Sequence, residues 1–226
     1  MPTLAFWNTA GNVAPATVAA FARESDADIL ILAENGIPDE TLVLALNSGV
    51  NRYYFLDPGP PGRLTILTRF VPQPASLVSD KNGVSIRQYR MPTGDSFLVV
   101  AVYLPSKLWK SAGDQSMGAT RVARYIREAE NRVGHQRTVV IGDLNMNPFE
   151  AGMVGSEGLH GVMDRKIASG QSRVVGGEES TFSIIRCGRF SATAVLHLRV
   201  RTFAAPTAKL TISGTFWIKC SSVLPC

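Results

Sequence analysis

The segment Thr138–Pro148, TVVIGDLNMNP, limits the possible fold more than any other stretch of the chain. Its run of branched apolar residues is typical of a strand that is buried on both faces. The run stops at Gly142, and the polar residues Asp143 and Asn145 follow. Residues two apart in a strand project from the same face, so these side chains should leave one edge of a sheet together. A plain strand-to-loop turn is the alternative interpretation, because Asp and Asn favour turns.

Strand-like and helix-like segments alternate along the part of the chain that precedes this segment. Helical spacing of apolar residues predicts helices over 15–26, 38–46 and 122–133. Apolar runs bounded by turn signals predict strands over 4–8, 28–34, 53–56, 64–70, 84–91, 96–104 and 138–145. Helices between strands, with a central run of hairpin-like strands, indicate a layered α/β architecture with a mixed sheet.

A chain of 226 residues is long enough to bury the core of one domain. It begins without a basic-then-apolar leader and has no apolar run that could cross a bilayer. We therefore expect a cytoplasmic protein without a membrane partner.

The formal charge of +5 is unevenly distributed. Residues 181–226 hold six basic residues and no Asp or Glu, which leaves 17 basic and 18 acidic residues in positions 1–180. The three cysteines, Cys187, Cys220 and Cys226, also lie in this tail, without metal-ligand spacing. We therefore divide the chain into a body, residues 1–182, and an atypical tail, residues 183–226.

Polar residues stand at the ends of several apolar runs of the body: Asn8, Glu34, Tyr103, Asp143 and Asn145. Binding sites of layered α/β folds form at strand ends. Glu34 has no basic neighbour in sequence and suits a hard cation such as Mg²⁺. Asn8 is placed either to support Glu34 or to hold a phosphate oxygen. Asp143 is placed to orient or deprotonate a water, Asn145 to fix a phosphoryl group, and Tyr103 to donate a hydrogen bond to that group.

Each of these residues also has a purely structural interpretation. Glu34 would then be a solvated charge at a strand exit, Tyr103 a core aromatic with its hydroxyl at the rim, and Asn8 a turn former. The order of the five residues along the chain favours the functional interpretation.

The motifs Phe6–Asn8, Ile31–Glu34, Val100–Pro105 and Ile141–Asn145 resemble successive motifs of the endonuclease/exonuclease/phosphatase superfamily, over roughly residues 4 to 150. The resemblance implies a four-layered α/β sandwich and phosphoester hydrolysis by an activated water, with Mg²⁺ (or Mn²⁺) as cofactor. It also implies Glu34 as metal ligand with Asn8 as its neighbour, Tyr103 at the phosphate, and Asp143 and Asn145 as the pair that orients the nucleophile.

The tail departs from that family, whose members end in further core strands and an Asp-His motif. No Asp follows Asp164, and His197 has no acidic partner in sequence. We therefore expect disrupted C-terminal strands and an incomplete active site. Read from the third base of each codon, the tail's possible codons permit Phe-Trp-Asn-Ile-Leu-Asp-Gln-Val-Leu, which resembles the closing segment of bacterial members. The tail thus looks frameshifted; a divergent basic extension is the alternative.

Two functions of different classes follow. The first is a metal-dependent phosphoester hydrolase, a nuclease or a phosphatase, whose activity the tail has impaired or abolished. The second is a catalytically dead domain that binds nucleic acid or a protein partner. The near-neutral body argues against strong non-specific DNA binding, although Lys107, Lys110 and Arg121 follow the Tyr103 strand.

Overall fold

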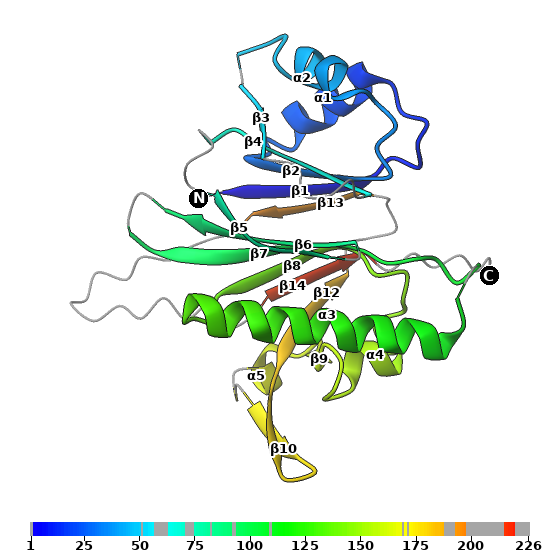
Figure 1. Ribbon diagram of the computed structural model, residues 1–226, viewed down its shortest axis with the longest axis vertical. Coiled ribbons are helices and arrows are strands. Elements are labelled where there is room, and N and C mark those ends of the chain that lie inside the picture. The colour runs from blue at the N-terminus through cyan, green and yellow to red at the C-terminus, as the bar shows by residue number, and fades with distance from the viewer. Residues whose placement is uncertain are drawn as a thin grey trace.

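The computed structural model describes residues 2–50, 52–56, 63–70, 75–81, 83–91, 94–108, 110–168, 170, 172–187, 193–197 and 215–219. These residues form two large sheets that face each other, helices on the outer side of each sheet, and a hairpin that projects from one end (Figure 1).

The first sheet has the strand order β13-β1-β2-β4-β3. Its strands are β1 (Thr3–Asn8), β2 (Ile29–Ala33), β3 (Tyr54–Phe55), β4 (Leu64–Thr68) and β13 (Thr193–His197). β1 and β2 run parallel, whereas the pairs β13–β1, β2–β4 and β4–β3 are antiparallel. The parallel pair brings the carboxyl ends of β1 and β2 to the same edge.

The second sheet has the order β5-β6-β7-β8-β14-β12-β9. Its strands are β5 (Ala75–Lys81), β6 (Val84–Arg90), β7 (Ser96–Tyr103), β8 (Thr138–Asp143), β9 (Gly161–Val162), β12 (Ser183–Cys187) and β14 (Thr215–Lys219). β5, β6 and β7 are antiparallel neighbours, whereas β7, β8, β14, β12 and β9 run parallel. A separate hairpin pairs β10 (Ser172–Val175) with β11 (Glu178–Thr181).

Helices cover both sheets, so the molecule has four layers (Figure 1). They are α1 (Pro15–Glu24), α2 (Asp39–Leu46), α3 (Ala112–Val133), α4 (Ala151–Val154) and α5 (Arg165–Ala168). One apolar cluster lies between the first sheet and α1 and α2, a second between the sheets, and a third between the second sheet and α3. The three buried clusters confirm the predicted α/β sandwich of mixed sheets.

Gly142 explains how β8 fits into the second sheet. β8 is buried throughout and lies parallel to β7, with Gly142 opposite Val102. A Cβ atom at Gly142 would meet the carbonyl oxygen of Val102 at 1.9 Å, so only glycine permits this close approach.

β5 was not predicted from the sequence. This edge strand carries Ser, Asp and Lys and has no fully buried residue, so it lacks the apolar alternation on which strand prediction depends.

Three strands of the tail join the two sheets. β13 pairs with β1, and β14 lies between β8 and β12. The other tail residues, 188–192, 198–214 and 220–226, lie outside the described part, as does the side-chain packing of these strands. Among the described helices, none is both long and apolar enough to span a bilayer.

Candidate active site

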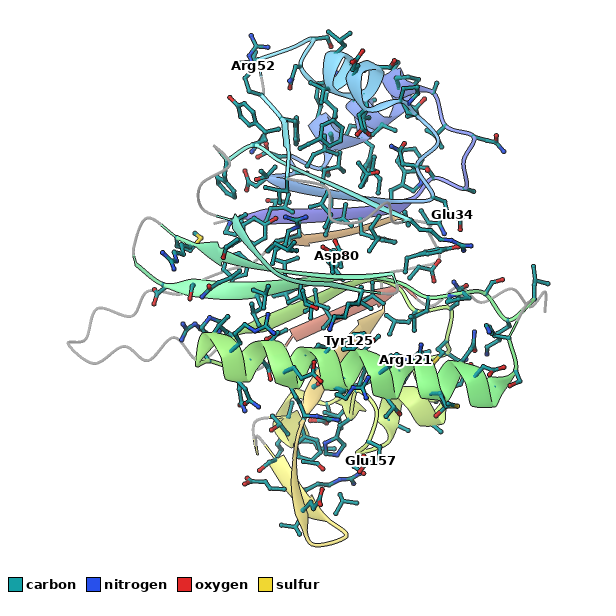
Figure 2. All side chains as sticks on the ribbon, in the orientation of Figure 1. Glu34, Arg52, Asp80, Arg121, Tyr125 and Glu157 are labelled. Atoms are coloured by element: carbon teal, nitrogen blue, oxygen red, sulfur yellow. The ribbon has the colours of Figure 1, made fainter. Side chains whose placement is uncertain are left out.

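The carboxyl ends of four strands meet at one end of the sandwich. Asn8 ends β1 and Glu34 follows β2 in the first sheet; Tyr103 ends β7 and Asp143 ends β8 in the second. Figure 2 shows Glu34 at this edge of the first sheet, beside the second sheet. Residues that are far apart in sequence thus become neighbours across the two sheets.

The Asn8 amide links the two acidic residues. Its Nδ2 lies 3.3 Å from Oε1 of Glu34 and 3.3 Å from Oδ2 of Asp143, so it donates to both carboxylates. The Tyr103 hydroxyl also donates to Oε1 of Glu34. The amide oxygen of Asn8 accepts from the backbone N–H of Ala10 at 3.0 Å, which fixes the direction of the amide.

The backbone holds Glu34 in a left-handed conformation with φ of 50°. Its N–H donates to the Arg63 carbonyl at 3.0 Å, and its carbonyl accepts from the Gly11 N–H at 3.0 Å and the Thr9 hydroxyl at 2.8 Å. Such a conformation is costly for a residue with a side chain and persists only where the surroundings determine it. These three bonds give the Glu34 side chain a defined direction.

Tyr103 stays protonated over the physiological range. Burial, reinforced by the hydrogen bond and the negative charge of Glu34, raises the pKa of Tyr103 to about 12. The Arg63 guanidinium lies over the Tyr103 ring, 5.6 Å from its centroid, and opposes this rise. The hydroxyl is therefore a hydrogen-bond donor at neutral pH.

Asn145 contacts Asp143, one of the four residues above. Its φ is 52°, its N–H donates to Oδ1 of Asp143 at 3.0 Å, and its Nδ2 donates to the Leu104 carbonyl at 2.7 Å. The Leu104 N–H returns a bond to the Asp143 carbonyl at 2.9 Å. The loops after β7 and β8 are thus joined, with Asn145 beside Asp143 rather than beside Glu34.

The oxygen donors of this site suit a small hard cation. Glu34 and Asp143 offer carboxylate oxygens, the ligands that Mg²⁺ prefers, and Mg²⁺ is commonly held by one or two carboxylates. For Asn8 to present its oxygen to a cation, its amide has to rotate away from Ala10. Within the described ranges, no cluster of three or more His, Cys, Asp or Glu side chains is able to hold a metal ion. Glu34 therefore fits a ligand of Mg²⁺ or Mn²⁺, with the Asp143 carboxylate close enough to share the Asn8 amide.

A groove of about 810 Å³ opens beside Tyr103, between the β5–β6 turn and α3. Its wall includes the cations Arg63, Lys81, Lys110 and Arg121 and the acids Asp80 and Asp114. Figure 2 shows Asp80 at the level of the second sheet, with Arg121 and Tyr125 on α3. Lys107 instead pairs with Glu150.

Arg63 was not predicted as a residue of the site. It follows a run rich in Pro and Gly and directly precedes β4, so only its position as a cation before a strand could have drawn attention to it.

Comparison with known families decides the relationship. The model of the endonuclease/exonuclease/phosphatase family matches residues 5–204. The chain belongs to this family. The match includes every residue of the candidate site. No curated protein matches the chain.

Several solved structures are similar to this family member. A humanized D. rerio TDP2 has 18% identity and a TM-score of 0.45, covering 68% of this chain and 66% of its own. An AP endonuclease from Archaeoglobus fulgidus has 18% identity and a TM-score of 0.46, covering 66% and 59%. A mannosyl-6-phosphatase from Bacteroides thetaiotaomicron has 13% identity and a TM-score of 0.48, covering 70% and 72%. The chain spans only 49% of the length of C. elegans TDP2.

Proposed function

We propose that this protein is a phosphoester hydrolase that depends on a divalent cation, Mg²⁺ or Mn²⁺, and acts as a nuclease or a phosphatase. The observation that carries the proposal is the Asn8 amide, which joins the carboxylates of Glu34 and Asp143 across the two sheets beside the Tyr103 hydroxyl. Hydrolysis of a phosphoester requires a base for water, donors for the phosphoryl oxygens and compensation of negative charge.

Each residue has a role in this proposal. Glu34 holds the cation, with Asn8 beside it, and the bound cation would compensate the charge of the phosphoryl oxygens. Asp143 orients the attacking water and accepts its proton. The neutral Tyr103 hydroxyl has one proton, so it would turn from Glu34 to donate to the phosphoryl group, and the Asn145 amide donates to the same group, which gains negative charge in the transition state.

The test is hydrolysis of a generic phosphodiester and a generic phosphomonoester, with and without Mg²⁺ or Mn²⁺. Glu34→Ala should abolish turnover. Glu157→Ala is the matched control, because Glu157 is exposed and lies on the far side of α3 (Figure 2). Turnover that survives Glu34→Ala, or that does not need the cation, would disprove the assignment.

A second candidate is a catalytically dead domain that binds nucleic acid or a protein partner. The composition of the tail favours it, because no Asp or Glu occurs in residues 181–226. β14 lies next to β8, and Lys219 occupies the register position beside Asp143. A family member would be expected to supply an acid from its C-terminal segment, so the visible tail leaves the site short of a carboxylate.

Sequencing the gene across codons 175 to 226 separates the candidates. If the gene proves to have one base more or fewer near codon 182 than the printed sequence implies, the true tail contains an Asp. The protein with that tail should then hydrolyse the substrates above. If the gene stands as printed and the protein shows no cation-dependent turnover, the binding function takes precedence.

A further inference from the structure

Gln115 is a buried polar residue outside the residues discussed so far, and it contacts the backbone of both loops that carry the site. It belongs to the start of α3, where a capping box fixes the first turn: the Ser111 hydroxyl accepts from the Asp114 N–H at 3.1 Å, and the Asp114 carboxylate accepts from the Ser111 N–H at 3.0 Å. The side chain of Gln115 is only 3% exposed. The helix therefore presents this amide to the strand ends in one orientation.

The amide nitrogen of Gln115 spans the two loops. Its Nε2 donates to the Asn145 carbonyl at 2.9 Å and lies 3.5 Å from the Pro105 carbonyl. Pro105 follows the Tyr103 strand, and Asn145 follows the Asp143 strand. A primary amide has two N–H donors, so one side chain can bind both carbonyls at once.

The oxygen of the same amide indicates that Gln115 is not there for packing. Its Oε1 is buried and has no hydrogen-bond partner in the described part of the chain. An unpaired buried acceptor is unfavourable, and an apolar side chain of the same length would avoid it. What an apolar side chain cannot supply is the pair of donors to the loops.

We propose that Gln115 is a positioning residue of the active site. It holds Asn145 in its left-handed conformation and joins the Asn145 loop to the loop after Tyr103. The Tyr103 hydroxyl and the Asn145 amide thereby stay at a fixed distance from each other, as binding of one phosphoryl group requires. This role rests on the proposed function. Loss of the bond should loosen Asn145 and lower the rate of the chemical step, because misplacement by about 1 Å is costly in catalysis.

The test is Gln115→Met, which removes both donors and the unpaired acceptor but keeps the length of the side chain. Gln115 is one residue of the wall of the groove beside Tyr103, so we expect kcat to fall about 10-fold and KM to change much less. Thermal stability should not decrease. Gln88→Met is the matched control: the Nε2 of Gln88 donates to the Ser96 hydroxyl at 3.1 Å, and Gln88 lies near the end of β6 that is away from the site, opposite Leu98.

A conservative variant gives a second, pH-dependent readout. Gln115→Glu places a carboxylate against two carbonyls at neutral pH, and only its protonated form has an O–H to donate. Its kcat relative to that of Gln115→Met should therefore rise as the pH falls toward 5. A purely structural role predicts no such recovery.

Backbone hydrogen exchange keeps the proposal testable if the protein has no turnover. In Gln115→Met, the backbone amides of residues 144–147 should exchange faster than in the wild type, whereas those of β7 and β8 should keep their protection. Absence of wild-type turnover would contradict the proposed function alone. Unchanged exchange at 144–147, or a fall in kcat no larger than that of Gln88→Met, would overturn the role of Gln115.

Discussion

The two ends of β2 carry acidic residues in different surroundings. At the start of the strand, Asp28 accepts from the Arg69 guanidinium at 2.7 Å and 3.2 Å and from the Thr3 N–H at 2.7 Å. At the other end, Glu34 accepts from two neutral donors, the Asn8 amide and the Tyr103 hydroxyl. Among the described residues, Glu34 makes no ion pair.

This difference separates an acid that stabilises the fold from one that is suited to a ligand. The charge of Asp28 is compensated within the protein, so a further cation would gain little there. Neutral donors orient the Glu34 carboxylate without compensating its charge, which leaves its attraction for a cation. The comparison makes four substitutions informative, together with one titration.

Replacing Asp28 should have the largest effect, and the effect should be on stability. In Asp28→Asn, the mostly buried Arg69 loses the less exposed of its two charged partners and keeps only Asp26, which is 76% exposed; the side chains of Arg69 and Asp28 are 20% and 16% exposed. We expect a loss of about 3 kcal/mol in the free energy of unfolding, the size found when one partner of a buried pair is removed. Denaturant unfolding measures this loss. Cation affinity of the folded protein should be unchanged, and a large change would contradict the comparison.

Replacing Glu34 should have the opposite pattern. Glu34→Gln removes a charge that lies near Asp143, so stability should be kept or slightly increased. Affinity for Mn²⁺, measured by titration calorimetry, should fall about 100-fold, equivalent to about 2.7 kcal/mol. A loss of stability as large as that of Asp28→Asn would identify Glu34 as a structural residue.

Tyr103→Phe should have a smaller effect, confined to catalysis. The variant keeps the buried ring but loses the donor to Glu34 and to the proposed phosphoryl group. We expect turnover to fall about 10-fold, or about 1.4 kcal/mol in transition-state stabilisation. Steady-state kinetics checks this, and an unchanged rate would remove Tyr103 from the mechanism.

The pKa of Tyr103 predicts the behaviour of the protein at high pH. The pKa of about 12 in the folded state lies above the ordinary value of 10.0. Tyr103 therefore contributes stability that is fully present below pH 10 and is lost as the pH rises through about 12. Subtracting the tyrosinate absorbance of Tyr103→Phe from that of the wild type should isolate this titration. A midpoint near the ordinary value would show that Tyr103 is neither buried nor bonded to Glu34.

Asp26→Asn should have the smallest effect. Asp26 also accepts from Arg69 at 2.7 Å, but its side chain is 76% exposed. Exposed ion pairs contribute about 0–1 kcal/mol, so the free energy of unfolding should change by less than about 1 kcal/mol. An effect equal to that of Asp28→Asn would mean that burial does not decide how much Asp26 and Asp28 each contribute to stability through Arg69.

The elements that depend on local patterns could be predicted from the residues alone. Apolar runs and helical spacing predicted β2, β8 and α1 within a few residues, because periodicity and turn residues act along the chain. The polar residues at strand ends were visible for the same reason. Their roles, including those of Asn8 and Asn145, stay predictions until the variants are measured.

Which residues come into contact depends on the packing of the sheets and helices and could not be predicted from local patterns. Asp28 and Glu34 flank the same strand in a similar way. They differ because Arg69, which follows β4, forms an ion pair with Asp28 and not with Glu34. Gln115 has no motif; it matters because α3 packs its first turns against the loops after β7 and β8. Such contacts depend on how sheets and helices stack. That stacking is set by the combined packing of all core residues and not by any local motif of the sequence.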